Sequence, residues 1–181
     1  MPLVRNGKGH FIKNTIMTNK VFIFTDGSSN PKSKEGGWAF CVTDDPKGKK
    51  AIHQDSGYKN STTNNRMELT AVINALYYSY FNINHLKELV IYSDSEYVSN
   101  PVYFDWLSEW RKNNWIKYDG SETKNSDLWE ELYQLLKKYK FRKITVDIRW
   151  VKGHNGHYFN EMVDKLAKKS RHKQEINSSY E

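Results

Sequence analysis

Short apolar runs along the chain predict five β-strands. The expected strands lie over residues 21–24, 38–42, 51–58, 89–92 and 144–150. The first run ends at Asp26-Gly27-Ser28, and residues 44–48 lie between the second and third strands; both segments have the composition of turns. We therefore expect the first three strands to form an antiparallel meander.

Between these runs the apolar residues recur at helical spacing. After Arg66, apolar side chains return once per helical turn up to Tyr80. Further helices are expected after Ser95, from Pro101, over residues 128–139 and over residues 162–167. Because proline suits the first position of a helix, the helix after Ser95 is expected to break near Asn100-Pro101. This order of strands and helices predicts a mixed α/β sheet with helices packed on it.

Length and charge describe one basic domain. The chain has 181 residues and a net charge of +7, and 14% of its residues are aromatic. We expect a flexible basic N-terminal arm over residues 1–19, one domain over residues 20–171 and a C-terminal tail over residues 172–181. Basic and aromatic side chains together favour a nucleic-acid partner, although the charge could also serve only solubility.

Cysteine usage and hydropathy exclude several classes of protein. Cys41 is the only cysteine, which excludes intramolecular disulfides and a zinc site built on several thiolates. No apolar run reaches the roughly 20 residues of a membrane helix, and residues 1–20 lack the apolar core of a secretory signal. We therefore expect an intracellular monomer in a reducing compartment, with no membrane and no disulfide-linked partner.

Four acidic residues occupy positions where a site could form. Asp26 and Asp94 end predicted strands, Glu68 lies in the first turn of a predicted helix, and Asp164 lies in the first turn of the last one. Carboxylates that converge repel one another, and a divalent cation would relieve that repulsion. Oxygen ligands without cysteine favour Mg²⁺ or Mn²⁺ over Zn²⁺.

Each acid also has a structural interpretation. Asp26 suits a turn, Asp94 with Ser95 could cap a helix, and Asp164 would favour the positive end of a helix dipole. Asn65-x-x-Glu68 fits a capping box. Spacing alone leaves open whether the acids converge.

Five motifs occur in an order that resembles ribonuclease H type 1, from about Val21 to Lys169. They are Phe24-Thr25-Asp26-Gly27-Ser28, Gly36-Gly37-Trp38, Thr62-Thr63-Asn64-Asn65-Arg66-Met67-Glu68-Leu69, Tyr92-Ser93-Asp94-Ser95 and Trp150-Val151-Lys152-Gly153-His154-Asn155-Gly156-His157, the last followed by Asp164-x-Leu166-Ala167. The resemblance implies a ribonuclease H-like α/β fold. Its mixed sheet would have five strands in the order 3-2-1-4-5, with strand 2 antiparallel and helices on both faces.

The resemblance also implies an activity: hydrolysis of the RNA strand of RNA–DNA hybrids, leaving 3′-hydroxyl and 5′-phosphate ends. Asp26, Glu68, Asp94 and Asp164 would bind two Mg²⁺ ions with substrate, and Mn²⁺ could substitute. His154 would move protons or assist product release, although a histidine in a glycine-flanked loop could also be merely solvated. His157 is expected to be structural.

The resemblance implies two groups of substrate-binding residues. The residues expected to contact the RNA strand are Ser28, Ser29, Asn30, Asn64, Asn65 and Glu96. Thr63 and Asn125 would hold a phosphate of the DNA strand, and a basic protrusion with Trp106, Arg111 and Lys112 would grip that strand. Helix capping by Asn64 and Asn65, and solvated charges in the protrusion, are the structural alternatives.

Three departures from the family pattern are visible. Residues 30–35 are more charged than the expected glycine-rich loop, Glu96 replaces a common glutamine, and the segment between Asp94 and Trp106 is one residue longer. Related folds that act as reverse-transcriptase-associated domains or integrase-like transferases fit the motifs less well. The main alternative is a catalytically weak nucleic-acid-binding module of the same fold, which would be expected to lack an acid.

Overall fold

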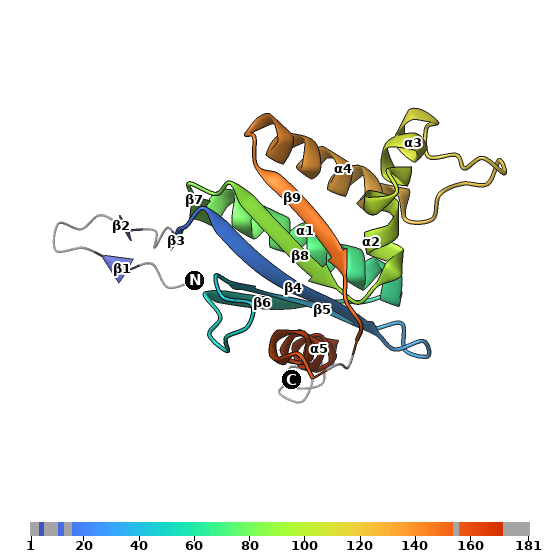
Figure 1. Cartoon of the computed structure of the whole chain (residues 1–181). Coiled ribbons are helices and arrows are strands. Elements are labelled where there is room, and N and C mark those ends of the chain that lie inside the picture. Colours follow the sequence, from blue (N-terminus) through green and yellow to red (C-terminus); the bar gives the residue numbers. More distant parts are fainter. Residues whose placement is uncertain (1–3, 6–10, 13–15, 154–155, 172–181) are drawn as a thin grey trace.

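A computed structural model describes residues 4–5, 11–12, 16–153 and 156–171. Its centre is a twisted five-stranded sheet with helices on both faces (Figure 1). The strands are β4 (Lys20–Ser29), β5 (Gly36–Thr43), β6 (His53–Lys59), β8 (Glu88–Ser93) and β9 (Thr145–Trp150). They lie in the order β6-β5-β4-β8-β9, with β5 antiparallel to both neighbours and β4, β8 and β9 parallel. The predicted strand order is confirmed.

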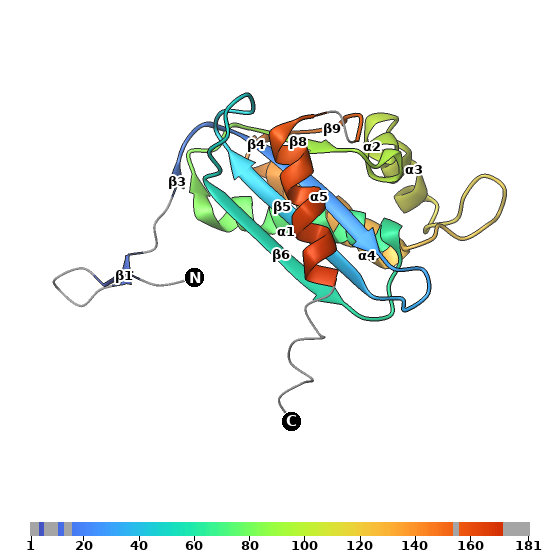
Figure 2. The same cartoon turned by 90° about the horizontal axis from the view of Figure 1, so that it is seen from below.

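Helices cover the two faces unequally. They are α1 (Asn64–Asn82), α2 (Glu96–Tyr103), α3 (Trp106–Lys112), α4 (Ser126–Phe141) and α5 (Tyr158–Arg171). Figure 2 shows α5 crossing β4, β5 and β6, while α1 and α4 lie on the opposite face. None of the helices in the described part of the chain has the length and hydrophobicity that a membrane span needs.

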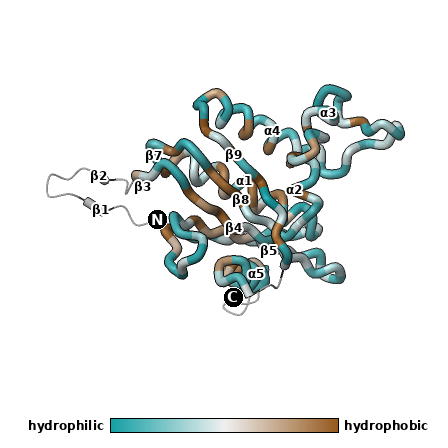
Figure 3. The backbone as a smooth tube through the Cα atoms, viewed as in Figure 1, coloured by the Kyte–Doolittle hydropathy of each residue, from teal (hydrophilic) through white to brown (hydrophobic). Residues whose placement is uncertain are grey.

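Two apolar cores hold these layers together. The larger packs the sheet against α1 and α4, with fully buried side chains such as Leu76, Ile91 and Trp129. The smaller joins Phe24 and Cys41 of the sheet to α5. Figure 3 shows hydrophobic residues along β4 and β8 and mostly hydrophilic residues in the loops. Burial of both faces explains why the central strands appear in the sequence as continuous apolar runs.

The chain before β4 contains short strands. β1 (Val4–Arg5) pairs antiparallel with β2 (Phe11–Ile12), and β3 (Ile16–Met17) pairs parallel with β7 (Ile83–Asn84). Lys87 also donates its backbone N–H to the carbonyl of Asn19, at 2.7 Å. Ile16 packs against the larger core, so apolar burial attaches residues 16–19 to the domain. Residues 16–19 of the expected N-terminal arm therefore contact the domain.

The predicted turn at Asp26-Gly27-Ser28 is wrong. β4 continues through these residues because β5 pairs with it as far as Ser29 and Gly36. The parallel pairing with β8 ends earlier, at Thr25 and Ser93. Asp26 therefore lies inside β4 at the point where β8 separates from it, which leaves space beside its carboxylate.

Gly27 allows α1 to pack directly on this part of β4. A Cβ atom at Gly27 would lie 2.2 Å from the backbone N of Glu68. Such a distance is far inside van der Waals contact, so a larger residue would have to displace either the helix or the strand. The close approach brings Glu68 to the same end of the sheet as Asp26.

α1 begins earlier than the capping-box interpretation requires. Thr63 is the N-cap, and its Oγ1 accepts a hydrogen bond from the N–H of Arg66 at 3.4 Å. Glu68 consequently lies in the second turn and is only 4% exposed, so it does not occupy the N3 position that a capping box requires. The capping-box interpretation of Glu68 is wrong.

Pro101 does not start a helix. It lies inside α2, which continues to Tyr103, and α3 begins only after Asp105 adopts a left-handed conformation with φ of 57°. Within this short helix Pro101 removes only the hydrogen bond that its own N–H would have donated. The break falls where Asp105 reverses the chain, not at the proline.

Candidate active site

Three carboxylates converge at one end of the sheet. Carboxylate oxygens of Asp26, Glu68 and Asp94 all lie within 4.8 Å of one another, although the residues come from β4, α1 and the end of β8. Asp164 of α5 lines the same cavity, whose volume is about 360 Å³. It lies in the second turn of α5, not the first, because the helix begins at Tyr158. The fold therefore places all four expected acids around one space.

The carboxylates strongly perturb one another. Burial raises the pKa of Asp26 to about 8, with further increases from the charges of Asp94 and Asp164; the Gly27 N–H and Lys168 oppose the shift. Burial also holds the pKa of Glu68 well above its ordinary value, and Asp26 and Asp94 add to that effect. Without a cation, these groups cannot all be ionised at neutral pH.

The donor set fits a hard divalent cation. Glu68 Oε1 accepts a hydrogen bond from Asn64 Nδ2 at 3.2 Å, whereas Oε2 is buried and has no hydrogen-bond partner among the described residues. A buried carboxylate oxygen left in this way is costly unless a ligand satisfies it. The nearby donors are carboxylate oxygens, which Mg²⁺ and similar ions prefer.

Lys168 is part of the cavity and was not expected from the sequence. Its Nζ lies 2.7 Å from Asp164 Oδ1, across one turn of α5. The four-residue spacing of Asp164 and Lys168 could have indicated this ion pair from the sequence, but such pairs are common on solvated helix faces. Here the ion pair orients the Asp164 side chain and places a positive charge beside the acids.

Asp94 is positioned by the last residue of β9 and by the segment that follows this strand. Trp150 donates its indole N–H to the backbone carbonyl of Asp94 at 3.1 Å. A Cβ atom at Gly153 would lie 2.6 Å from Asp94 Oδ2, so the absence of a side chain there lets the segment approach closely. His154 comes next in the chain and lies outside the described residues.

Comparison with known proteins agrees with this arrangement. A family model described as RNase H matches residues 18–172. The chain belongs to the ribonuclease H family. It is 38% identical over 156 residues to a protein of Rickettsia typhi named Ribonuclease H, covering 86% of this chain and 93% of the relative. A Ribonuclease H of Chlorobium luteolum is 37% identical over 158 residues, with coverage of 85% and 97%.

A solved structure resembles the fold as well. It is LC9-RNase H1, described as a type 1 RNase H with the type 2 active-site motif. The TM-score is 0.69 at 28% sequence identity, covering 87% of this chain and 74% of the other. The four acids of this ribonuclease H family member thus occupy a fold shared with a solved type 1 enzyme.

Of the six residues expected to contact RNA, Ser28 and Asn64 line the acid cavity. Ser28 lines it and accepts a hydrogen bond from Arg171 Nη1 at 3.1 Å. The Ser29 N–H donates to Asn64 Oδ1 at 3.2 Å, which ties β4 to the start of α1. Asn64 therefore serves both Glu68 and Ser29, while the neighbouring Asn65 is exposed.

Two of the expected RNA contacts have other surroundings. Asn30 Oδ1 accepts hydrogen bonds from the N–H groups of Lys32 and Ser33, so its carbonyl oxygen closes the turn after β4. Glu96 is the first residue of α2 and its side chain is exposed. Its position in a first helical turn suits a negative charge whether or not RNA is bound.

Arg66 links the two residues expected to hold a DNA phosphate. It lies in the helical turn capped by Thr63, and its Nη1 donates to Asn125 Oδ1 at 3.2 Å. It also forms two hydrogen bonds with Asp127, at 2.9 and 2.6 Å. Asn125 in turn donates to the Tyr97 hydroxyl at 2.9 Å. These contacts hold Asn125 in its left-handed conformation, with φ of 60°.

The expected basic protrusion corresponds to α3 and the loop after it. Trp106 is 44% exposed and stacks on Phe104, whereas Trp110 packs edge-on against the core residue Trp129. Arg111 Nε lies 2.7 Å from Glu130 Oε2, and Lys112 pairs with Glu109 within α3. Trp106 is therefore available at the surface, while both cations already have acidic partners.

We expect the metal-free fold to lose stability as the pH rises from about 4 to about 8. The folded protein keeps the Asp26 proton until about pH 8, whereas the unfolded chain releases it near 3.8. Unfolding between these values releases a proton, so raising the pH favours the unfolded state. The loss attributable to Asp26 should be on the order of 4 kcal/mol between pH 5 and 8, or roughly 8–16 °C.

Thermal unfolding in chelator at pH 5 and pH 8 measures this loss. The Asp26→Asn variant has no ionisable group at this position, so its melting temperature should fall less between pH 5 and pH 8 than that of the wild type. Equal decreases in the wild type and the variant would contradict the predicted effect of burial on Asp26.

Proposed function

We propose that this protein is an endonuclease that hydrolyses the RNA strand of RNA–DNA hybrids and leaves 3′-hydroxyl and 5′-phosphate ends. The observation that carries the proposal is the convergence of Asp26, Glu68 and Asp94 within 4.8 Å in a member of the ribonuclease H family. Asp164 completes an acidic cavity on the surface, open to a polymer. Phosphodiester hydrolysis is chemistry that such a cluster supports with divalent ions.

We propose Mg²⁺ as the cofactor, with two ions present when substrate is bound and Mn²⁺ able to substitute. Asp26, Glu68, Asp94 and Asp164 would hold them, because they supply only oxygen donors and Glu68 has a buried oxygen without a partner. When bound, such ions lower the pKa of the attacking water and stabilise the leaving 3′-oxygen.

The protein's own residues prepare this cavity. Asn64 orients Glu68 through one carboxylate oxygen and leaves the other free to face the cavity. Trp150 holds the backbone of Asp94, and Lys168 holds Asp164. These supports fix the acids before substrate arrives, so little reorganisation is needed during the reaction. We assign proton transfer or product release to His154.

The substrate would lie across the cavity, between two groups of residues. We assign RNA-strand contacts to Ser28, Ser29, Asn30, Asn64, Asn65 and Glu96. These can recognise 2′-hydroxyl groups, which distinguish RNA from DNA. Thr63 and Asn125 would hold a DNA phosphate, and Trp106 with Arg111 and Lys112 would bind the DNA strand. The net charge of +7 agrees with such a polyanion.

The same reasoning extends to the wider context. We propose that the protein acts as a monomer in a reducing intracellular compartment, with residues 20–171 as the catalytic domain between a basic arm and a tail. Cys41 is buried, which fits the absence of a disulfide-linked partner. The alternative, a catalytically weak binding module of the same fold, is disfavoured because all four acids surround the cavity.

A cleavage assay tests the function directly. Labelled RNA should be cut when paired with DNA and remain intact as duplex RNA or as a single strand, and cutting should need Mg²⁺. Equal cleavage of all three RNA forms would exclude hybrid specificity. Tight hybrid binding without cleavage in Mg²⁺ or Mn²⁺ would favour the binding module.

Replacing Trp106, Arg111 and Lys112 together with alanine should weaken hybrid binding and flatten its salt dependence. The two cations would lose their phosphate contacts, so the slope of log affinity against log salt should fall by roughly 1–2. Filter binding in Ca²⁺ at several salt concentrations measures the slope. Lys137→Ala/Lys138→Ala on α4 removes the same charge outside the protrusion and serves as the control. Unchanged binding in the triple variant would exclude the protrusion as a DNA contact.

A further inference from the structure

A second cavity lies on the α5 side of the sheet and shares no lining residue with the acid cavity. We call it the β8–α5 cavity and define it by Phe24, Lys47, Tyr92, Trp150, Lys152 and His157. Its volume is about 480 Å³, within the usual range for small-molecule sites. In the described structure α5 packs on β4, β5 and β6 and leaves this face of β8 open (Figure 2).

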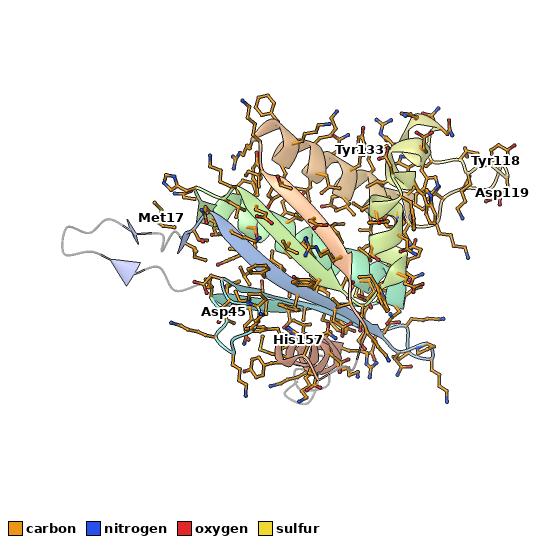
Figure 4. All side chains as sticks on the ribbon, viewed as in Figure 1. Met17, Asp45, Tyr118, Asp119, Tyr133 and His157 are labelled. Carbon is orange, nitrogen blue, oxygen red and sulfur yellow. The ribbon has the colours of Figure 1, made fainter. Side chains whose placement is uncertain are left out.

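Aromatic rings form the wall of the cavity. Phe24 stacks on Tyr92 with ring centroids 4.9 Å apart, and on His157 at 4.6 Å. His157 lies beside α5 (Figure 4). Phe24, on which it stacks, is only 2% exposed. Trp150 adds a large ring that is 49% exposed. Phe24 is buried beneath these contacts, and the exposed rings of Trp150 and His157 are the faces that could stack on a planar aromatic ligand.

Two lysines provide positive charge at the same cavity. Lys47 comes from the loop between β5 and β6, and Lys152 from the segment after β9. Both side chains are exposed, and neither forms an ion pair with another described residue. Asn160, which is only 5% exposed, also lines the cavity and offers an amide. Rings, an amide and two cations together match a base that carries a phosphate.

We propose that the β8–α5 cavity binds a single nucleotide, with its base among the aromatic rings and its phosphate near Lys47 and Lys152. This site is additional to the hybrid-cleavage site and does not depend on hydrolysis. It shares a segment with that site, because Trp150 and Gly153 both contact Asp94. The nucleotide could be free, or it could be one residue of a single strand.

Calorimetric titration of AMP in chelator tests the site. Without divalent ions the acid cavity repels phosphate, so binding there does not contribute. We expect one AMP per chain with a Kd below about 1 mM. Lys47→Ala/Lys152→Ala should weaken the binding of AMP about tenfold, because it removes two partly screened contacts between lysine and phosphate. The binding of adenosine, which has no phosphate, should be unchanged. Val151→Trp should fill the cavity and abolish binding of both ligands.

Controls separate this site from general charge effects and from catalysis. Lys49→Ala/Lys50→Ala removes two charges from the same loop outside the cavity lining and should leave AMP binding unchanged. Asp26→Asn should also leave it unchanged, even though hybrid cleavage is lost. Failure of hybrid cleavage in the wild type with normal AMP binding would refute the proposed function and leave the nucleotide site standing.

Two further outcomes are decisive. If a single-stranded tetranucleotide binds more than tenfold tighter than AMP, and Val151→Trp abolishes this tighter binding, the site is supported and its ligand is one residue of a strand. If the tetranucleotide binds no tighter than AMP, the site is supported and its ligand is a free nucleotide. No AMP binding up to 10 mM, or equal weakening in the Lys49/Lys50 control, would overturn the proposal.

Discussion

Asp26→Asn should reduce cleavage of an RNA–DNA hybrid by at least about 10³-fold while the fold remains intact. Asparagine keeps the shape of the side chain but removes the charge at the centre of the cluster, where oxygens of three acids lie within 4.8 Å. Divalent ions contribute several kcal/mol to the stabilisation of a phosphodiester transition state, and about 1.4 kcal/mol corresponds to a factor of ten in rate. Single-turnover cleavage in Mg²⁺ measures the loss.

The fold should become more stable in the same variant. At pH 7 the metal-free folded protein must keep the buried Asp26 protonated, whereas the unfolded chain ionises it freely, and asparagine removes this penalty on folding. Asp55→Asn, an identical change on the exposed side of β6, is the matched control and should alter neither activity nor stability. Cleavage by Asp26→Asn within tenfold of the wild type would exclude Asp26 as a metal ligand.

Chelation of divalent ions should abolish cleavage, and added Mg²⁺ should restore it. The acid cavity repels a phosphate backbone unless cations neutralise it, so the loss should again be at least about 10³-fold. Activity measured over a range of free Mg²⁺ concentrations gives the concentration at which activity is half-maximal.

Glu68→Gln should raise this half-maximal Mg²⁺ concentration at least tenfold, because a neutral amide replaces the buried carboxylate whose Oε2 has no partner among the described residues.

Melting temperature provides an independent measurement of metal binding. In the wild type at pH 8, Mg²⁺ should raise the melting temperature, since an ion that binds only the folded state stabilises it. Asp55→Asn should respond like the wild type, while Asp26→Asn and Glu68→Gln should respond less. Hybrid cleavage that persists in excess chelator would rule out the metal-dependent mechanism.

The acid cavity is costly to the stability of the fold. Burial, together with the neighbouring carboxylates, raises the pKa of Asp26 and of Glu68, and one buried oxygen of Glu68 has no partner among the described residues. Such groups destabilise a protein unless a ligand is present, and their removal commonly exchanges activity for stability. Asn64 and Lys168 reduce this cost through one hydrogen bond and one ion pair.

Several features could be predicted from the sequence because they depend on local patterns. Continuous apolar runs indicate strands buried on both faces, and spacing of three and four residues indicates helices. The strand order that the structure confirms was implied by the resemblance to ribonuclease H and not by these local patterns. The basic charge likewise pointed to a polyanion before any site was located.

The prediction of a turn at Asp26 failed because a distant segment decides the outcome. Asp26 has turn-forming neighbours, yet it lies within β4 because β5 pairs with it through Ser29. The ion pair between Arg111 and Glu130 of α4 could likewise not be predicted from the basic stretch around Arg111. Local composition carries no information about such partners, since they are brought together only when the sheet and helices pack.

By itself, the sequence determined which residues could carry the chemistry and which elements hold them: four acids on strands and helices, without thiolates for a zinc site. Only the tertiary structure decided that these acids meet. Gly27 lets α1 approach β4 so closely that Glu68 reaches Asp26, and α5 packs across the other face to bring Asp164 and Lys168 to the same cavity. Convergence depends on packing distances between elements far apart in the chain, and the spacing of residues along the chain does not specify those distances.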